Sequence, residues 1–168
     1  MEIILDTCIV QYYLKSETRP LVQAYFERLS EKFNMPMKDF SVSMISKFEL
    51  LRGAKKILPI TEILQRVHKI PVSEEILTLS AFLSSACQNR NGHPIYDDGD
   101  CIIGGASFSI PSSYVLTADG DGFPRPFFSE ADSFEYSYLK NRKDRSLRFY
   151  LLSHNMRELV DGLASHRG

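Results

Sequence analysis

Four acidic residues of this chain stand at positions from which their carboxylates could meet: Asp6, Glu49, Asp100 and Asp119. Asp6 follows the apolar run Ile3-Ile4-Leu5, and Asp119 comes just after Tyr114-Val115-Leu116-Thr117. Glu49 and Asp100 lie near the starts of two helical patterns. In an open parallel sheet, functional groups collect at the carboxyl ends of the strands, and the helices that follow begin at that edge. These positions therefore predict one shared carboxylate site.

Such a site needs a cation, because two unit charges 4 Å apart repel by about 4 kcal/mol at an effective dielectric of 20. One or two Mg²⁺ ions relieve this repulsion, and Mg²⁺ prefers oxygen ligands while keeping several waters. A bound metal lowers the pKa of its water, orients a scissile phosphate and offsets charge on the leaving oxygen. The pattern predicts a metal-dependent enzyme that cleaves phosphodiester bonds. Asp6 and Asp100 are expected to hold metal directly, Asp119 through water, and Glu49 by ligation or by ordering the attacking water.

The surrounding elements have to bring these residues together. Short apolar runs predict strands over residues 3–5, 40–42, 114–117 and 149–152, and apolar spacing predicts helices over residues 19–33, 43–54, 73–86, 101–108 and 156–163. Strands that alternate with helices favour a three-layer α/β/α sandwich with a mainly parallel central sheet. The length of 168 residues fits a single domain, residues 1–168. Residues 124–147 break the pattern and are expected to be an insertion or irregular excursion.

Composition narrows the class of protein. The chain is 43% hydrophobic and 24% charged, which is typical of a soluble globular protein, and no membrane span is expected. The chain starts without the basic leader of a secretory signal. Its three cysteines, Cys8, Cys87 and Cys101, have no metal-ligand spacing, which favours free thiols in a reducing cytoplasm.

The net charge of −1 gives no global positive field, so attraction to a polyanion must come from bound metal or local bases. Arg52 and Lys56 follow Glu49 on its helix and are the candidates for guiding a nucleic acid to the site. The basic run from Lys140 to Arg148 is open to two interpretations, a solvated surface or a contact with phosphates, and the first is favoured.

Four motifs resemble, in order, those of the PIN-domain ribonucleases. They are Ile3-Ile4-Leu5-Asp6-Thr7, Phe48-Glu49-Leu50-Leu51-Arg52-Gly53-Ala54, Asp100-Cys101-Ile102-Ile103-Gly104-Gly105-Ala106 and Leu116-Thr117-Ala118-Asp119-Gly120-Asp121-Gly122-Phe123. The resemblance covers roughly residues 1–125, and the branch that the motifs resemble is that of the VapC-like toxins of toxin–antitoxin pairs.

This resemblance implies a PIN-like sandwich, a Mg²⁺ or Mn²⁺ site and endonucleolytic cleavage of RNA in the cytoplasm. It also implies a homodimer and, in the toxin branch, a small antitoxin partner. Asp6, Glu49, Asp100 and Asp119 take the acidic positions, and Thr7 and Thr117 take those of hydroxyls near the metal, its waters or the substrate. Asp121 competes with Asp119, because it is offset by one from where a second acid often stands.

Two other functions stay open. One is a PIN-like RNA-processing or RNA-binding protein outside a toxin system. The other is a Mg²⁺-dependent phosphatase-type α/β enzyme, which would also place an acid after its first strand. Haloacid-dehalogenase-like phosphatases have Asp-x-Asp at that point, whereas this chain has Asp6-Thr7-Cys8, which argues against them.

Overall fold

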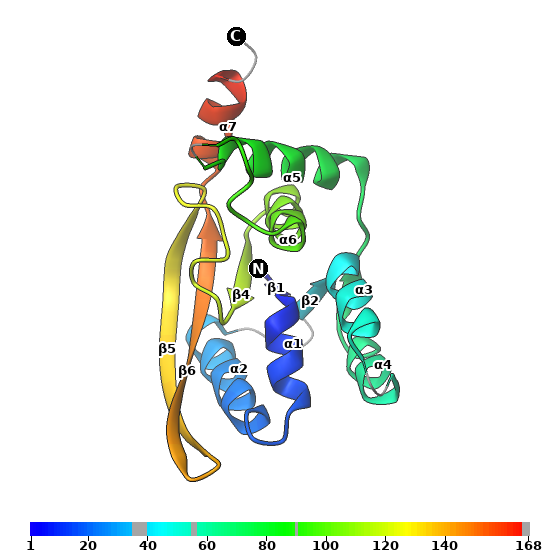
Figure 1. Cartoon of the computed structure of the whole chain (residues 1–168), viewed down its shortest axis with the longest axis vertical. Helices are drawn as coiled ribbons and strands as arrows, with labels where there is room; N and C mark the ends of the chain where they lie inside the picture. The colour runs from blue at the N-terminus through cyan, green and yellow to red at the C-terminus, as the bar shows by residue number, and fades with distance from the viewer. Residues whose placement is uncertain (35–39, 55–56, 90, 166–168) are drawn as a thin grey trace.

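A computed structural model describes residues 1–34, 40–54, 57–89 and 91–165 of the chain. Within these residues the strands form one six-stranded sheet of order β3-β2-β1-β4-β6-β5 (Figure 1). The strands are β1 (Glu2–Leu5), β2 (Phe40–Ser43), β3 (His68–Ile70), β4 (Ser113–Thr117), β5 (Phe128–Lys140) and β6 (Lys143–His154). The first four run parallel, and β6 pairs antiparallel with both β4 and β5. The prediction of a mixed α/β fold with a mostly parallel sheet is confirmed.

The central strand, β1, is covered on both faces. Its residues Ile3 and Ile4 are 0% exposed and Leu5 is 3% exposed. Ile3 and Leu5 belong to one apolar cluster, and Ile4 belongs to the other. This arrangement explains why the strand is a continuous apolar run, since a parallel strand buried on both faces has no polar side to show.

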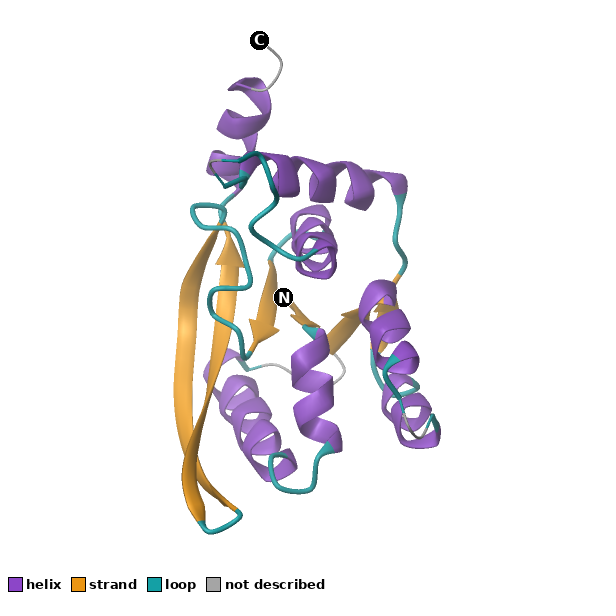
Figure 2. Cartoon of the chain, viewed as in Figure 1, coloured by secondary structure: helices purple, strands orange, loops and turns teal. Residues whose placement is uncertain are grey.

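Helices fill both outer layers, as Figure 2 shows. The layer that contains Ile3 and Leu5 receives side chains from α1 (Thr7–Leu14), α2 (Arg19–Phe33) and α4 (Leu58–Leu64). The other layer receives them from α5 (Glu74–Ala86), α6 (Asp98–Ser109) and α7 (Met156–Ser165). The helix α3 (Met44–Arg52) contributes Leu50 to the first layer and Ile45 to the second. Among the described residues, none of the helices combines the length and apolar content needed to cross a membrane.

Side-chain caps fix where three helices start. Ser43 accepts a hydrogen bond from the Ile45 N–H at 3.3 Å, and Ser73 accepts one from the Ile76 N–H at 3.2 Å. Asp97, rather than Asp98, caps α6, because its carboxylate accepts the Gly99 N–H at 2.8 Å. Such caps satisfy backbone donors that have no partner inside the helix. Asp100 consequently lies in the first turn of α6, where the helix dipole favours a negative charge.

Two regions differ from the sequence-based expectation. Residues 124–147 are not an irregular excursion, because β5 and the start of β6 lie within them and form a long hairpin. Asn141 and Arg142 make its turn with φ values of 52° and 61°, the positive values that a tight two-residue hairpin turn requires. The short helices α1 and α4 were not expected either, and they owe their stability to the side chains that they bury against the sheet.

The hairpin is anchored to α2 by one acid. The pairing register shifts between Glu130 and Asp132, and the Asp132 side chain, 7% exposed, points at α2. It accepts a hydrogen bond from Tyr25 at 3.1 Å and pairs with Lys32 at 2.5 Å and Arg28 at 3.5 Å. A shift of this kind re-aims a side chain. The hairpin is thereby fixed to the helical layer beside α1.

Two adjacent glycines of α6, Gly104 and Gly105, pack closely against neighbouring elements. A Cβ atom at Gly105 would lie 2.5 Å from Ser80 Oγ and 2.7 Å from the Ile76 carbonyl oxygen of α5. A Cβ atom at Gly104 would lie 3.1 Å from Leu83 and 3.2 Å from Phe128. The absence of side chains at these positions lets α6 approach α5 and β5 closely.

We expect Gly105→Ala to lower the free energy of unfolding by about 1–2 kcal/mol, because overpacking outweighs the better helix propensity of alanine. Urea unfolding followed by circular dichroism measures this. Gly53→Ala is the matched control, since a Cβ atom there would meet the Glu49 carbonyl oxygen at an ordinary 3.5 Å. Equal stability of the two variants would contradict the packing described for α5 and α6.

Candidate active site

Asp6 stands at the junction of β1 and α1 with its carboxylate directed into the fold. It is 5% exposed and occupies the N-cap position of α1 without making a side-chain cap. Its Oδ2 atom instead accepts hydrogen bonds from Thr117 Oγ1 at 2.6 Å and Cys8 Sγ at 3.0 Å. Its N–H donates to the Leu116 carbonyl at 3.0 Å, which ties it to β4. The tip of the carboxylate is therefore oriented by β4 and α1 and does not serve the helix end.

Glu49 lies in the second turn of α3, not at its start, and is half-buried. Its Oε2 atom accepts a hydrogen bond from Thr7 Oγ1 at 2.5 Å. Thr7 is the first residue of α1 and follows Asp6 directly. The hydroxyl of Thr7 therefore links α3 to the start of α1, next to Asp6.

Two glycines leave the space in which the acids meet. A Cβ atom at Gly122 would lie 3.3 Å from Asp100 Oδ2 and 3.3 Å from Asp119 Cγ, so these two carboxylates are neighbours across that glycine. A Cβ atom at Gly99 would lie 2.5 Å from Glu49 Oε1, in direct conflict with it. Any larger residue at either position would intrude among the carboxylates.

Asp100 shows electrostatically that the acids form one group. Burial, and after it the negative charges of Asp6, Asp97, Asp119 and Glu49, together raise the pKa of its carboxyl to about 7. Burial disfavours the charged form of an acid, and so does each like charge nearby. The structure thus places the four predicted acids near one another and adds Asp97, the N-cap residue of α6.

The structure separates Asp119 from Asp121. Asp119 is exposed beside Asp100, its N–H donates to Thr117 Oγ1 at 2.9 Å, and its Oδ1 accepts the Asp121 N–H at 3.2 Å. The Asp121 side chain is 93% exposed and pairs with Arg125 at 3.2 Å. Asp119 is the acid that faces the group, and Asp121 is a residue of the turn.

The predicted substrate-binding residues have different surroundings. Thr7 and Thr117 both donate to carboxylates, so in this structure they orient Glu49 and Asp6. Arg52 is exposed and lies over the Phe48 ring at 5.6 Å, and Lys56 lies outside the described residues. A groove of about 590 Å³ beside Glu49 is lined in part by Lys15, the residue that follows α1. Sequence reasoning missed Lys15 because α1 itself was not expected.

Cys8 was also missed as a site residue. Burial, followed by the charge of Asp6, raises the pKa of its thiol, so it stays protonated and donates to Asp6. A thiol in this state is neither a nucleophile nor a metal ligand. The donors that remain are carboxylate and hydroxyl oxygens.

Those oxygens are of the kind that Mg²⁺ or Mn²⁺ binds. In the described part of the chain no three His, Cys, Asp or Glu side chains are arranged as a ready set of ligands for one ion. Mg²⁺ is usually held by only one or two carboxylates and keeps several waters, so a preformed set of three is not required. Asp100 and Asp119 lie close together across Gly122, and their oxygens are the donors that such a hydrated ion would contact.

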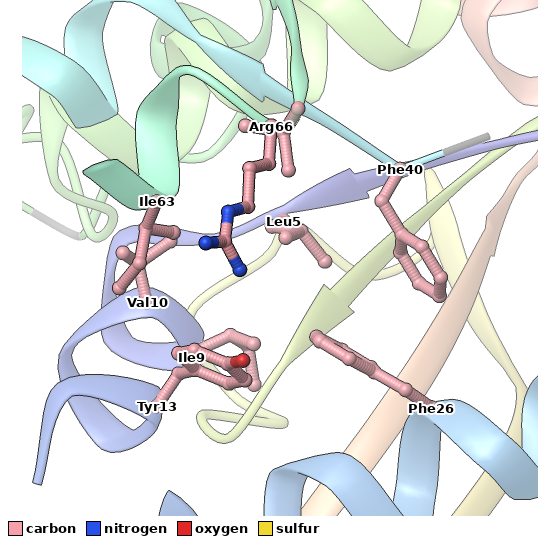
Figure 3. A pocket seen from close by; sticks show the side chains of 9 residues that line it. Leu5, Ile9, Val10, Tyr13, Phe26, Phe40, Ile63 and Arg66 are labelled. Carbon is pink, nitrogen blue, oxygen red and sulfur yellow. The ribbon is translucent and has the colours of Figure 1, made fainter. Parts of the chain in front are cut away.

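An apolar pocket of about 240 Å³ lies elsewhere, between α1, α2 and α4. Figure 3 shows it lined by side chains such as Leu5, Ile9 and Phe26, with the Arg66 side chain directed into it. None of the four acids lines it. The pocket is better enclosed than the groove beside Glu49, but its apolar walls do not suit a phosphodiester. The cluster of four acids, Asp6, Glu49, Asp100 and Asp119, is therefore the candidate active site.

The fold is mixed α/β, and the four acids of the candidate site gather where its parallel strands end. The sequence matches no model of a known protein family and no curated protein. A PIN-like assignment therefore stays a prediction from the four sequence motifs.

We expect the stability of the metal-free protein to fall as pH rises from about 4 to about 7. The folded state holds a proton on Asp100 up to about pH 7, whereas the unfolded state loses it near the ordinary aspartate pKa of 3.8, so the folded state binds more protons in this window. Asp100→Asn should remove this part of the slope and stabilise the protein at pH 8 by on the order of 1 kcal/mol, after allowance for solvent screening. Urea unfolding in EDTA at several pH values tests this. An unchanged slope would contradict the close grouping of the acids.

Proposed function

We propose that this protein is a Mg²⁺- or Mn²⁺-dependent endoribonuclease with a PIN-like fold. The observation that carries the proposal is the grouping of Asp6, Glu49, Asp100 and Asp119 at one edge of the sheet, with burial and like charges raising the Asp100 pKa to about 7. A group of acids kept half-buried without a cation costs stability. Such an arrangement is typical of a functional site and not of a structural one.

Asp6 and Asp100 would hold the metal, and Asp119, which is exposed, would hold it through water. The ion would supply an activated water and would offset charge on the leaving oxygen. Thr117 and Cys8 fix the orientation of Asp6 by donating to its Oδ2 atom. Thr7 does the same for Glu49, whose remaining oxygen is free to accept a hydrogen bond from the attacking water.

The order of the four motifs favours the toxin branch, so we further propose a cytoplasmic toxin that forms a homodimer and is held by a small antitoxin. An RNA-processing enzyme outside a toxin system would use the same site. The phosphatase alternative is less favoured, because Cys8 stands where a second aspartate would be needed and its thiol is protonated.

Metal binding can be tested without activity. We expect Mn²⁺ to raise the midpoint of thermal unfolding of the wild-type protein, because an ion that binds only the folded state stabilises it, by about 2.7 kcal/mol at 100 times its dissociation constant. Asp6→Asn and Asp100→Asn should reduce this shift strongly. Asp98→Asn is the control, since Asp98 is exposed on the same turn of α6 as Asp100. An equal shift in all four proteins would place the ion elsewhere.

Cleavage of a mixed RNA pool tests the reaction itself. We expect cleavage with Mn²⁺ or Mg²⁺ and none with EDTA. Asp6→Asn, Asp100→Asn and Asp119→Asn should each lower the rate by about 100-fold or more. Asp121→Asn should keep the wild-type rate, because its carboxylate pairs with Arg125 away from the group. Cleavage that survives both chelation and the substitutions would refute the proposal.

A further inference from the structure

The closed end of the β5–β6 hairpin carries like charges placed directly opposite each other. Lys140 pairs with Lys143 beside the turn, and Arg145 pairs with Tyr138 two residues along. Because side chains alternate along a strand, Lys140, Lys143, Tyr138 and Arg145 share one face. Like charges directly opposite on a sheet are destabilising. We call the cations Lys140, Lys143 and Arg145 the hairpin tip.

Nothing in the described chain neutralises these charges. Within the described residues, none of the three cations of the hairpin tip forms an ion pair with an acid. Asp144 pairs with Leu139, which puts it on the opposite face of the hairpin. Glu17, in the α1–α2 loop, lies within electrostatic range of Lys140. Because Glu17 is fully exposed, water screens the attraction between the two charges. This face of the hairpin is therefore suited to bind an anion of another molecule.

The hairpin tip lies on the side of the molecule where the carboxylates are. Figure 1 shows the hairpin running past the carboxyl ends of the parallel strands to the region of the α1–α2 loop. Tyr150 of β6 pairs with Thr117 beside the carboxylates, and the strand then rises by about 3.3 Å per residue, which puts Lys143 roughly 20 Å from the site.

Aromatic rings and cations span this distance. Tyr12 of α1 lies within electrostatic range of both Asp119 and Tyr138. Lys15 lies over the Tyr12 ring at 4.8 Å and lines the groove beside Glu49. Cations interleaved with aromatic rings are typical of surfaces that bind single-stranded nucleic acids, with phosphates on the cations and bases on the rings.

We propose that the hairpin tip, with Lys15, binds backbone phosphates of the RNA strand whose scissile bond lies at the carboxylates. This inference rests on the proposed function and names its substrate-binding surface. It accounts for how a protein of net charge −1 attracts RNA to an acidic site. It also means that a substrate has to extend roughly 20 Å beyond the scissile bond to be held well.

The test compares two variants with the same change of charge. Lys143→Gln/Arg145→Gln removes two cations of the hairpin tip, and Lys69→Gln/Arg157→Gln removes two exposed cations from β3 and α7. Binding of a fluorescent single-stranded RNA of about 20 nucleotides is measured by anisotropy in EDTA over a range of salt. We expect the hairpin-tip variant to bind about 10-fold more weakly, with the salt slope reduced by about 1.4, or 0.7 for each lost phosphate contact. The control variant should keep the wild-type slope.

Further arms separate the outcomes. Lys143→Arg/Arg145→Lys keeps the charges and should bind as the wild type does, which excludes a folding defect. Weaker RNA binding by the hairpin-tip variant with no wild-type cleavage in Mn²⁺ would support this surface and overturn the nuclease. Cleavage together with unchanged binding and slope in the hairpin-tip variant would overturn this inference alone. Binding of poly-glutamate, but not RNA, through the tip would also overturn it, since the surface would then suit an acidic protein.

Discussion

The burial of β1 between two parallel neighbours and two apolar layers is the constraint on which the rest of the structure depends. Its three apolar residues, Ile3, Ile4 and Leu5, are almost completely hidden from solvent. The strand ends just before Asp6, the first polar residue after this run, whose buried carboxylate is held by Thr117 and Cys8. Its backbone is fixed by the Leu116 carbonyl, so the ends of β1 and β4 lie in register. The acids of the candidate site gather at these strand ends.

The same edge concentrates negative charge that the fold only partly compensates. Two threonine hydroxyls and one thiol donate to Asp6 and Glu49, but Asp100 receives no such partner among the described residues. Its raised pKa is the consequence, because burial and four neighbouring charges oppose its ionisation. A residue larger than glycine at position 99 or 122 would crowd these acids. The grouping of these acids lowers the free energy of unfolding, a cost that is typical of functional sites.

The hairpin shows how an antiparallel extension can be added to this parallel core. Asp132, at the shift in register, ties it to three side chains of α2, so its base is rigid. Its far end carries three cations on one face, Lys140, Lys143 and Arg145, that form no ion pair within the described residues. The four site acids thus lie near the ends of the central strands, and these three cations lie on an extension of the sheet. In the proposed ribonuclease, the centre would hold the metal and the extension the RNA.

The sequence by itself determined the parallel strands, the capped helices and the order of the four acids, because these depend on local patterns such as the run at residues 3–5 and the capping residues Ser43 and Ser73. It did not reveal the hairpin, where Phe134, Tyr136 and Tyr138 recur every second residue among polar ones, since that strand is stabilised by distant pairing with β6 and by α2. The roles of Cys8 and Lys15, and the separation of Asp119 from Asp121, came only from tertiary structure. Local patterns fix how a segment folds, whereas the surroundings of a side chain depend on which distant segments pack against it.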